Sequence, residues 1–273
     1  MFLSKLDSLG NARKLIYDNQ QICGVEEISI HDAHKRVLAE DIIAFHNSPP
    51  FDKSAMDGFA LIAEDTFGAS NSAPKEFKII DAIGAGDFSD KTVGKGEAVI
   101  IATGAPIPDG ANAVLMKEYT TGKGDDLTIY SQVTPGENVS PKSEDIEKGQ
   151  KILDKNTFIR YQELGLIASA GYDTVRVFKK PKVKLIITGN ELVEPTKEEI
   201  DDAKIINSNQ FTIKAMVEDS GAICDIWHAG DTFDEVREAI LDDCEDYDVI
   251  MTTGGTASSH RSEERRVGKE CRS

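Results

Sequence analysis

From Pro181 onward, the hydrophobic positions alternate between two patterns, one typical of strands and one typical of helices. Short continuous apolar runs predict buried strands, and the segments between them repeat apolar residues at helical spacing. Thr232 and Glu235 form a capping box at the start of one helix. The expected elements are strands at 183–187, 222–227 and 248–251, with helices at 210–220 and 232–242. Strands that alternate with helices in this way indicate a doubly wound, largely parallel α/β unit.

Residues 47–141 show a different pattern. Short runs of β-type residues are separated by clusters of Gly, Pro, Asn and Asp, which is typical of a small β-rich domain. The expected strands are 77–80, 98–101, 113–116 and 127–133.

Helical patterns return on either side of this region. Before it, residues 9–20 predict a helix, residues 25–30 a strand and residues 32–37 a short helix. After it, Thr157 is expected to cap the N-terminus of a helix that Gly171 ends.

Length, charge and cysteine usage narrow the class of protein. A chain of 273 residues is long enough for two or more domains. Its formal charge of −17 opposes nucleic acid and anionic membranes, which select basic surfaces. Four cysteines without a Cys-x-x-Cys pair indicate neither a disulfide framework nor a zinc ribbon. No apolar run approaches the roughly 18 residues of a membrane span. From the charge, the cysteines and the absence of such a run together, we expect a cytoplasmic protein with no nucleic-acid or membrane partner.

The last thirteen residues, 261–273, read RSEERRVGKECRS. This string is the translation of a common sequencing adapter, so we exclude it from the interpretation of the fold. We expect the natural gene to continue differently after His260.

Three loops follow the predicted strands of the α/β unit, at the sheet edge where ligands bind in such folds. They are 188–192 (TGNEL), 228–231 (HAGD) and 252–256 (TTGGT). Each contains glycine, which lets the backbone approach a ligand, and two contain a carboxylate. As a set they predict a phosphate or pyrophosphate site with Mg²⁺, because N–H groups hold oxygens and carboxylates hold the cation. Each loop alone also suits an ordinary turn.

The sequence lacks the common nucleotide and hydrolase motifs. No Gly-Lys pair precedes Ser or Thr, and Gly84-Ala-Gly86 lacks the third glycine of a dinucleotide fingerprint. There is no His-Glu-x-x-His and no Gly-x-Ser-x-Gly. We therefore expect no protein nucleophile.

Two further stretches carry candidate chemistry in the β-rich region. In PPFDKSAMDGFA (49–60), Asp57-Gly58 is a turn pair in which we expect Gly58 to supply a positive φ and leave the Asp57 carboxylate at the bend. In TGAPIPDGANAVLMKE (103–118), a loop rich in Gly and Pro presents backbone N–H groups and the Thr103 hydroxyl. A surface turn and a rigid connector would show the same local patterns.

Both stretches resemble signatures of the MoeA family, the molybdopterin molybdenumtransferases, to which the gephyrin E domain also belongs. TGNELV, AGD and TTGGT resemble loops of the same family, in the same order. The resemblance covers residues 1–257.

The resemblance implies an α/β multidomain fold class. A mixed α+β elongated domain comprises residues 1–46 plus 142–180, with the β-rich domain (47–141) inserted into it. A partial MogA-like, doubly wound molybdopterin-binding domain follows at 181–260. From the adapter-like string we expect the tail at 261–273 to be non-native.

The resemblance also implies an activity, which is insertion of molybdate into adenylylated molybdopterin with release of AMP and dependence on Mg²⁺. The substrates would bind at sites shared between the subunits of a homodimer. The implied catalytic residues are Asp57, Thr103, Glu191 and Asp231, and the last two are also the implied metal ligands. The implied cofactor-binding residues are Thr188, Gly189, Gly254, Gly255 and Thr256.

Two other functions remain open at this point. One is a non-catalytic molybdopterin-binding or scaffold protein, as kinship with gephyrin permits, and the other is a tungstate-specific version of the enzyme. After Ala257 the sequence departs from the family pattern, and the basic residues and the β-barrel domain that the family carries further on are absent. We therefore expect the chain as written not to turn over by itself.

Overall fold

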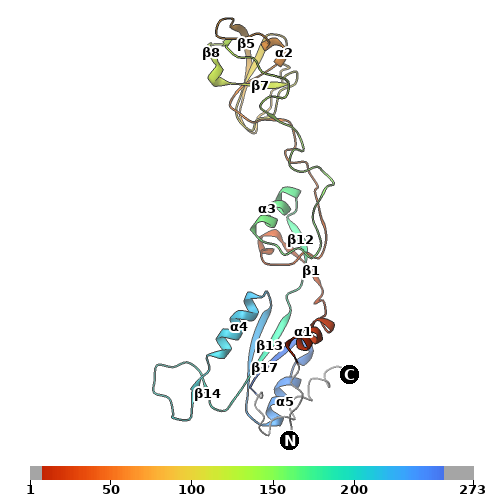
Figure 1. Cartoon of the computed structure of the whole chain (residues 1–273), viewed down its shortest axis with the longest axis vertical. Coiled ribbons are helices and arrows are strands. Elements are labelled where there is room, and N and C mark those ends of the chain that lie inside the picture. The colour runs from red at the N-terminus through yellow and green to blue at the C-terminus, as the bar shows by residue number, and fades with distance from the viewer. Residues whose placement is uncertain (1–7, 255–273) are drawn as a thin grey trace. The chain divides into compact units, whose positions relative to one another are not determined.

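The structure is a computed structural model that describes residues 8–254 (Figure 1). Gly255, Thr256 and the tail at 261–273 lie outside the described residues. The described part of the chain forms two compact units. Residues 8–40, 156–160 and 174–254 make the first, here called the α/β unit, and residues 41–155 and 161–173 make the β-rich unit. The three-part division expected from the sequence stays a prediction.

A six-stranded sheet with the order β7-β4-β6-β5-β9-β8 forms the centre of the β-rich unit. Its strands are β4 (Gly58–Leu61), β5 (Lys75–Ile83), β6 (Glu97–Ile101), β7 (Ala113–Met116), β8 (Thr120–Lys123) and β9 (Asp126–Ile129). β5 and β6 are parallel, and the other neighbouring strands are antiparallel. All four strands predicted in this region are present, although the last ends at Ile129 and does not reach Val133.

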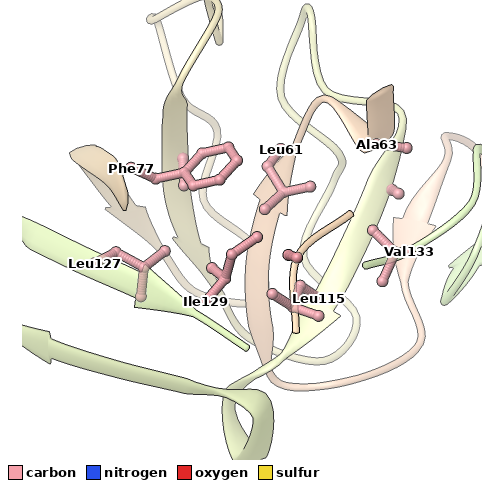
Figure 2. Close-up of a cluster of buried hydrophobic side chains, with 10 residues drawn as sticks. Leu61, Ala63, Phe77, Leu115, Leu127, Ile129 and Val133 are labelled. Carbon is pink, nitrogen blue, oxygen red and sulfur yellow. The ribbon is translucent and has the colours of Figure 1, made fainter. Parts of the chain in front are cut away.

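Apolar clusters cover both faces of this sheet. Along β4, Phe59 and Leu61 pack into one cluster while Ala60 packs into the other, as expected because successive side chains of a strand point to opposite faces. Figure 2 shows the first cluster, in which Leu61 and Leu115 lie near Ile129. Central strand β4 is therefore held between two cores.

Shorter elements complete the β-rich unit. β2 (Ile42–Ile43) pairs with β11 (Lys151–Leu153), and β3 (Lys53–Ser54) pairs with β10 (Val139–Ser140), both antiparallel. The remaining elements are α2 (Ala63–Thr66), a 3₁₀ turn at Lys117–Tyr119 and α3 (Tyr161–Ala170).

Helix α3 confirms one predicted boundary and corrects the other. Gly171 follows the helix with φ +97°, which is the left-handed conformation that favours glycine after a helix. The helix begins only at Tyr161, so Thr157 is not its N-cap. The Thr157 carbonyl instead accepts a hydrogen bond from the Leu38 N–H at 2.9 Å.

A parallel three-stranded sheet with the order β16-β13-β17 forms the core of the α/β unit. The predicted alternation of strands and helices is confirmed, with a capping box at Thr232. β13 is buried from Val183 to Ile187 because it lies between two strands, which explains its continuous apolar run. The elements are β13 (Lys182–Thr188), α4 (Asn209–Asp219), β16 (Ile223–Ala229), α5 (Phe233–Leu241), a 3₁₀ turn at Cys244–Asp246 and β17 (Val249–Thr253). A short parallel pair, β14 (Leu192–Val193) and β15 (Ile205–Ile206), lies between β13 and α4 in the chain.

The N-terminal segment also belongs to the α/β unit. α1 (Leu9–Asp18) and β1 (Val25–Ser29) appear where they were predicted, and β1 pairs antiparallel with β12 (Thr174–Phe178). The helix predicted at 32–37 is wrong, because the chain makes only a 3₁₀ turn at Ile30–Asp32 and then pairs at Val37 and Leu38 as isolated bridges.

One buried charge interrupts the apolar run of β13. Lys184 is fully buried, and its ammonium lies 3.8 Å from the centre of the Trp227 ring. The Nζ atom also donates a hydrogen bond to the Asp242 carbonyl oxygen beyond α5. Lys184 therefore links β13, β16 and the end of α5.

Candidate functional site

Asp57 lies at a bend immediately before β4. Its Oδ1 atom accepts two hydrogen bonds from Thr103, one from the backbone N–H and one from the hydroxyl, both at 2.8 Å. The Lys117 Nζ lies 3.4 Å from Oδ2. The structure thus brings together the Asp57 and Thr103 that the sequence singled out, and it adds Lys117.

These contacts favour the ionised carboxylate. The Thr103 backbone N–H, its hydroxyl and then the Lys117 ammonium hold the pKa of Asp57 below its usual range. Asp57 is exposed, so its negative charge is fixed in place and accessible to a ligand.

The reason for glycine at position 58 differs from the prediction. Gly58 is not among the residues with positive φ. A Cβ atom added to it would lie 2.1 Å from the carbonyl oxygen of Leu115 on the neighbouring strand β7. Close approach of two strands, and not turn geometry, therefore requires the glycine beside Asp57.

A cavity of about 470 Å³ opens beside this carboxylate. Asp57 and Lys117 are its only charged lining residues in the described part of the chain. The rest of its lining comes from β4, from the ends of β5 and β6, and from Gly84 and Ala102, which follow those two strands. An ion pair in the lining of an otherwise uncharged cavity is typical of sites that orient a ligand with a few polar groups.

The second group of predicted residues lies at the carboxyl ends of β13, β16 and β17. Thr188 ends β13, and its hydroxyl donates to the Thr253 carbonyl oxygen at 2.5 Å. Gly254 (φ +93°) follows β17, and a Cβ atom there would lie 2.4 Å from the Thr188 hydroxyl oxygen. Gly189 (φ +144°) opens the next loop. Thr188, Gly189 and Gly254 therefore meet at one sheet edge, as predicted.

Two carboxylates gather around the loop that begins at Gly189. A Cβ atom on Gly189 would lie 2.8 and 2.9 Å from the two Glu191 carboxylate oxygens. Asp231 Oδ2 accepts a hydrogen bond from the Asn190 N–H at 3.2 Å. Glu191 and Asp231 thus both lie against the Gly189-Asn190 backbone, although one follows β13 and the other follows β16.

A cavity of about 440 Å³ lies at the same sheet edge. It is lined by Gly189, His228 and Gly230 from the predicted loops, and also by Glu194 and Asn207. Glu194 and Asn207 are not among the site residues predicted from the sequence. The only local signal was the Asn207-Ser-Asn209 cluster before a helix, which is also what an ordinary N-cap looks like.

Asp57 and Thr103 belong to the β-rich unit, whereas Thr188, Gly189, Glu191, Asp231 and Gly254 belong to the α/β unit. Each group is assembled within its own unit. Among residues 8–254, no set of three or more His, Cys, Asp or Glu residues is placed to hold a metal ion. No helix in that range is long and apolar enough to cross a membrane.

Two family models match the chain. Residues 8–171 match the MoeA N-terminal region (domain I and II), and residues 184–266 match a probable molybdopterin binding domain. The first match alone covers more than half of the chain.

Individual relatives agree with these matches. A protein of Staphylococcus aureus named molybdopterin molybdenumtransferase is 40% identical over 231 residues, which are 84% of this chain and 55% of the relative. A Staphylococcus epidermidis protein of the same name is 38% identical over 231 residues, with the same coverage of both chains. The chain therefore spans about half the length of the curated relatives it matches.

The architecture also matches a solved structure. The crystal structure of a molybdopterin biosynthesis moeA protein from Pyrococcus horikoshii superimposes with a TM-score of 0.84 at 35% identity. The match covers 92% of this chain and 67% of that one. The fold class expected from the sequence is confirmed, and the chain belongs to the MoeA family.

Proposed function

We propose that this chain acts in molybdenum cofactor biosynthesis as a molybdopterin molybdenumtransferase, which inserts molybdate into adenylylated molybdopterin and releases AMP. The observation that carries the proposal is the Asp57–Thr103–Lys117 arrangement in the β-rich unit, built from both stretches that resemble the family signatures. Relatives of the chain carry the name of this activity. A cytoplasmic location, expected from the sequence, is part of the same proposal.

The proposed Mg²⁺ fits the carboxylates at the sheet edge. Glu191 and Asp231 both lie against the Gly189-Asn190 backbone, and Mg²⁺ typically takes one or two carboxylates together with substrate phosphates and waters. These two residues would hold the ion, which would supply charge neutralisation at the phosphate oxygens.

The chain's own residues would position the substrates. Gly189 and Gly254 would let a phosphate group approach the backbone of the sheet edge closely, because glycine carries no side chain. Asp57 would stay ionised, since Thr103 donates two hydrogen bonds to it. No protein nucleophile is needed in this scheme.

The predicted homodimer is part of the proposal. No residue of α1 is buried, and Leu9, Leu15 and Ile16 expose 71%, 57% and 71% of their surfaces. An exposed apolar face of this kind supports association with a second copy. In such a dimer we expect Asp57 of one subunit to face Glu191 and Asp231 of its partner.

A chimera tests the activity. Residues 8–254 replace the matching segment of the Staphylococcus aureus relative, and AMP release is measured with adenylylated molybdopterin, molybdate and Mg²⁺. We expect release that depends on both molybdate and Mg²⁺. Asp231→Asn should lower the rate by about 10²-fold, as for loss of one charge-stabilising group, and change the stability by no more than about 0.5 kcal/mol.

Exposed Asp202 provides the matched control. Asp202→Asn makes the same chemical change and should leave the rate unaltered. Binding of the substrate without any AMP release would favour the scaffold function, and a collapse of the melting temperature in Asp231→Asn would show that this residue is structural. Replacing molybdate by tungstate in the same assay decides between the two oxyanions.

A further inference from the structure

Asn207 is a buried polar residue at the cavity of the α/β unit. The residue is only 2% exposed, and it lies between β15 and α4 in the chain. Its Oδ1 atom accepts a hydrogen bond from the Gln210 N–H at 3.3 Å. Its Nδ2 atom, also buried, has no hydrogen-bond partner among the described residues.

The orientation of this amide is fixed by its neighbour. Rotating the amide to exchange its oxygen and nitrogen would place Nδ2 against the Gln210 N–H, so that two donors would face each other. The unpaired donor is therefore a property of the site. Native structures leave few such groups, and each calls for an explanation such as a ligand atom.

Glu194 lines the same cavity and supplies acceptors. The Gln210 Nε2 atom donates to both of its carboxylate oxygens at 2.9 Å. A carboxylate has about four lone-pair sites, so others remain for a ligand. Because Gln210 bonds both Asn207 and Glu194, it holds a donor and an acceptor in fixed relation at one cavity wall.

The charge of the cavity selects the kind of ligand group. Its described lining contains no Lys or Arg, and its only carboxylate is Glu194. His228 Nε2 lies 3.8 Å from Glu194 Oε1, so the one residue able to carry a positive charge is already beside a negative one. This wall disfavours a phosphate and favours an uncharged ring with both donors and an acceptor on one edge.

We propose that Asn207 and Glu194 recognise the pyrimidinone edge of a pterin ring. That edge presents a carbonyl oxygen, a ring N–H and an amino group in a row. Asn207 Nδ2 donates to the carbonyl oxygen, and the Glu194 carboxylate accepts from the N–H and the amino group. A cavity of about 440 Å³ is within the range of small-molecule sites. This assignment rests on the proposed function, since it orients the pterin part of the same substrate.

The test measures binding of 6-hydroxymethylpterin to the 1–273 chain by the fluorescence of the pterin. Asn207→Ser removes Nδ2 and keeps an oxygen for the Gln210 N–H, and Glu194→Gln changes an exposed side chain that does not support the core. Each variant should bind the pterin about tenfold more weakly, as expected for the loss of one hydrogen bond to a buried or charged group. Asn207→Asp, which places a carboxylate against the ring carbonyl, should weaken binding further.

Controls separate this role from a structural one. Asn71→Asp, at an exposed position in the β-rich unit, should bind like the unaltered chain, and Glu194→Gln should keep the same melting temperature. AMP and inorganic pyrophosphate, titrated in parallel, should bind equally well to the chain with and without Asn207→Ser.

Three results would overturn the assignment. They are absence of pterin binding by the unaltered chain, a pterin affinity of Asn207→Ser and Glu194→Gln equal to that of the unaltered chain, and a loss of affinity confined to AMP or pyrophosphate. If any of these results is found while the chimera still releases AMP, the assignment of Asn207 and Glu194 to the pterin ring is overturned and the proposed function stands. Pterin binding that depends on Asn207, in a chimera that releases no AMP, would count against the proposed function alone.

Discussion

Gly58 offers the sharpest test of how the β-rich unit is built. A Cβ atom at this position would lie 2.1 Å from the Leu115 carbonyl oxygen, 2.9 Å from its carbon and 3.1 Å from the Met116 Cα. Ordinary contacts begin at 3.4 Å, so Gly58→Ala requires β4 and β7 to separate by roughly 1 Å. The obstructing atoms are backbone and cannot rotate away.

The expected cost follows from this geometry. Overpacking of a close contact costs about 1–3 kcal/mol, and each ladder hydrogen bond that the separation weakens adds about 0.5–1.5 kcal/mol. We therefore expect Gly58→Ala to lower the free energy of unfolding of the β-rich unit by about 2–4 kcal/mol. Asp57 precedes this strand directly, so its contact with Thr103 should loosen as well.

Gly165 provides a control with the opposite sign. It lies inside α3, does not have a positive φ, and has no atom within 4 Å of an added Cβ. Gly165→Ala should therefore stabilise the unit by about 0.5–1 kcal/mol, because alanine loses less entropy in a helix.

Hydrogen exchange of peptides from β4, β6 and β7 measures the local free energy of opening. The single tryptophan, Trp227, lies on β16 of the α/β unit, so its fluorescence reports that unit separately. Unchanged exchange in Gly58→Ala, or equal destabilisation by Gly165→Ala, would refute the close-approach argument.

Two further predictions concern polar side chains. Lys184→Ala should destabilise the α/β unit by about 2–5 kcal/mol, whereas the stability of Lys184→Met should stay within about 1.5 kcal/mol of the unaltered chain. The reason is that the stem of the lysine fills the core and methionine replaces its volume. Equal urea midpoints for the two variants would contradict this prediction. Thr103→Val should raise the pKa of Asp57 in a carboxyl NMR titration but leave it below its usual range, because the backbone N–H bond remains. Because folding lowers this pKa, the hydrogen bonds from Thr103 stabilise the fold at pH values above the ordinary pKa of a carboxyl group. That contribution is lost as the pH falls through the lowered pKa. An unchanged titration in Thr103→Val would show that the hydroxyl contributes nothing.

Local patterns predicted most of the regular elements. The strands β7 and β13 and the capping box at Thr232 depend on residues close in sequence, so periodicity and cap chemistry were sufficient. The glycine-containing loops at the sheet edge also followed, because parallel strands place their carboxyl ends together.

The errors arose where distant segments decide the structure. Gly58 is required by β7, which lies far along the chain, and no turn rule contains that information. Val37 and the adjacent Leu38 form bridges with the later residues Phe158 and Val177, and this pairing overrides the helical pattern of residues 32–37. Asn207 was missed because an unpaired donor is recognised only when its surroundings are known.

The pairing of β1 with β12 has a consequence for synthesis on the ribosome. Ile28 lies opposite Val175, so the first strand leaves the ribosome about 150 residues before its partner. At 5–20 residues per second, that edge waits about 7–30 s without its neighbour. The β-rich unit, whose residues all lie between the two strands in the sequence, emerges during this interval. Because an unpaired edge invites pairing with other chains, translation speed through residues 41–173 should influence how much of the protein aggregates before its first sheet closes.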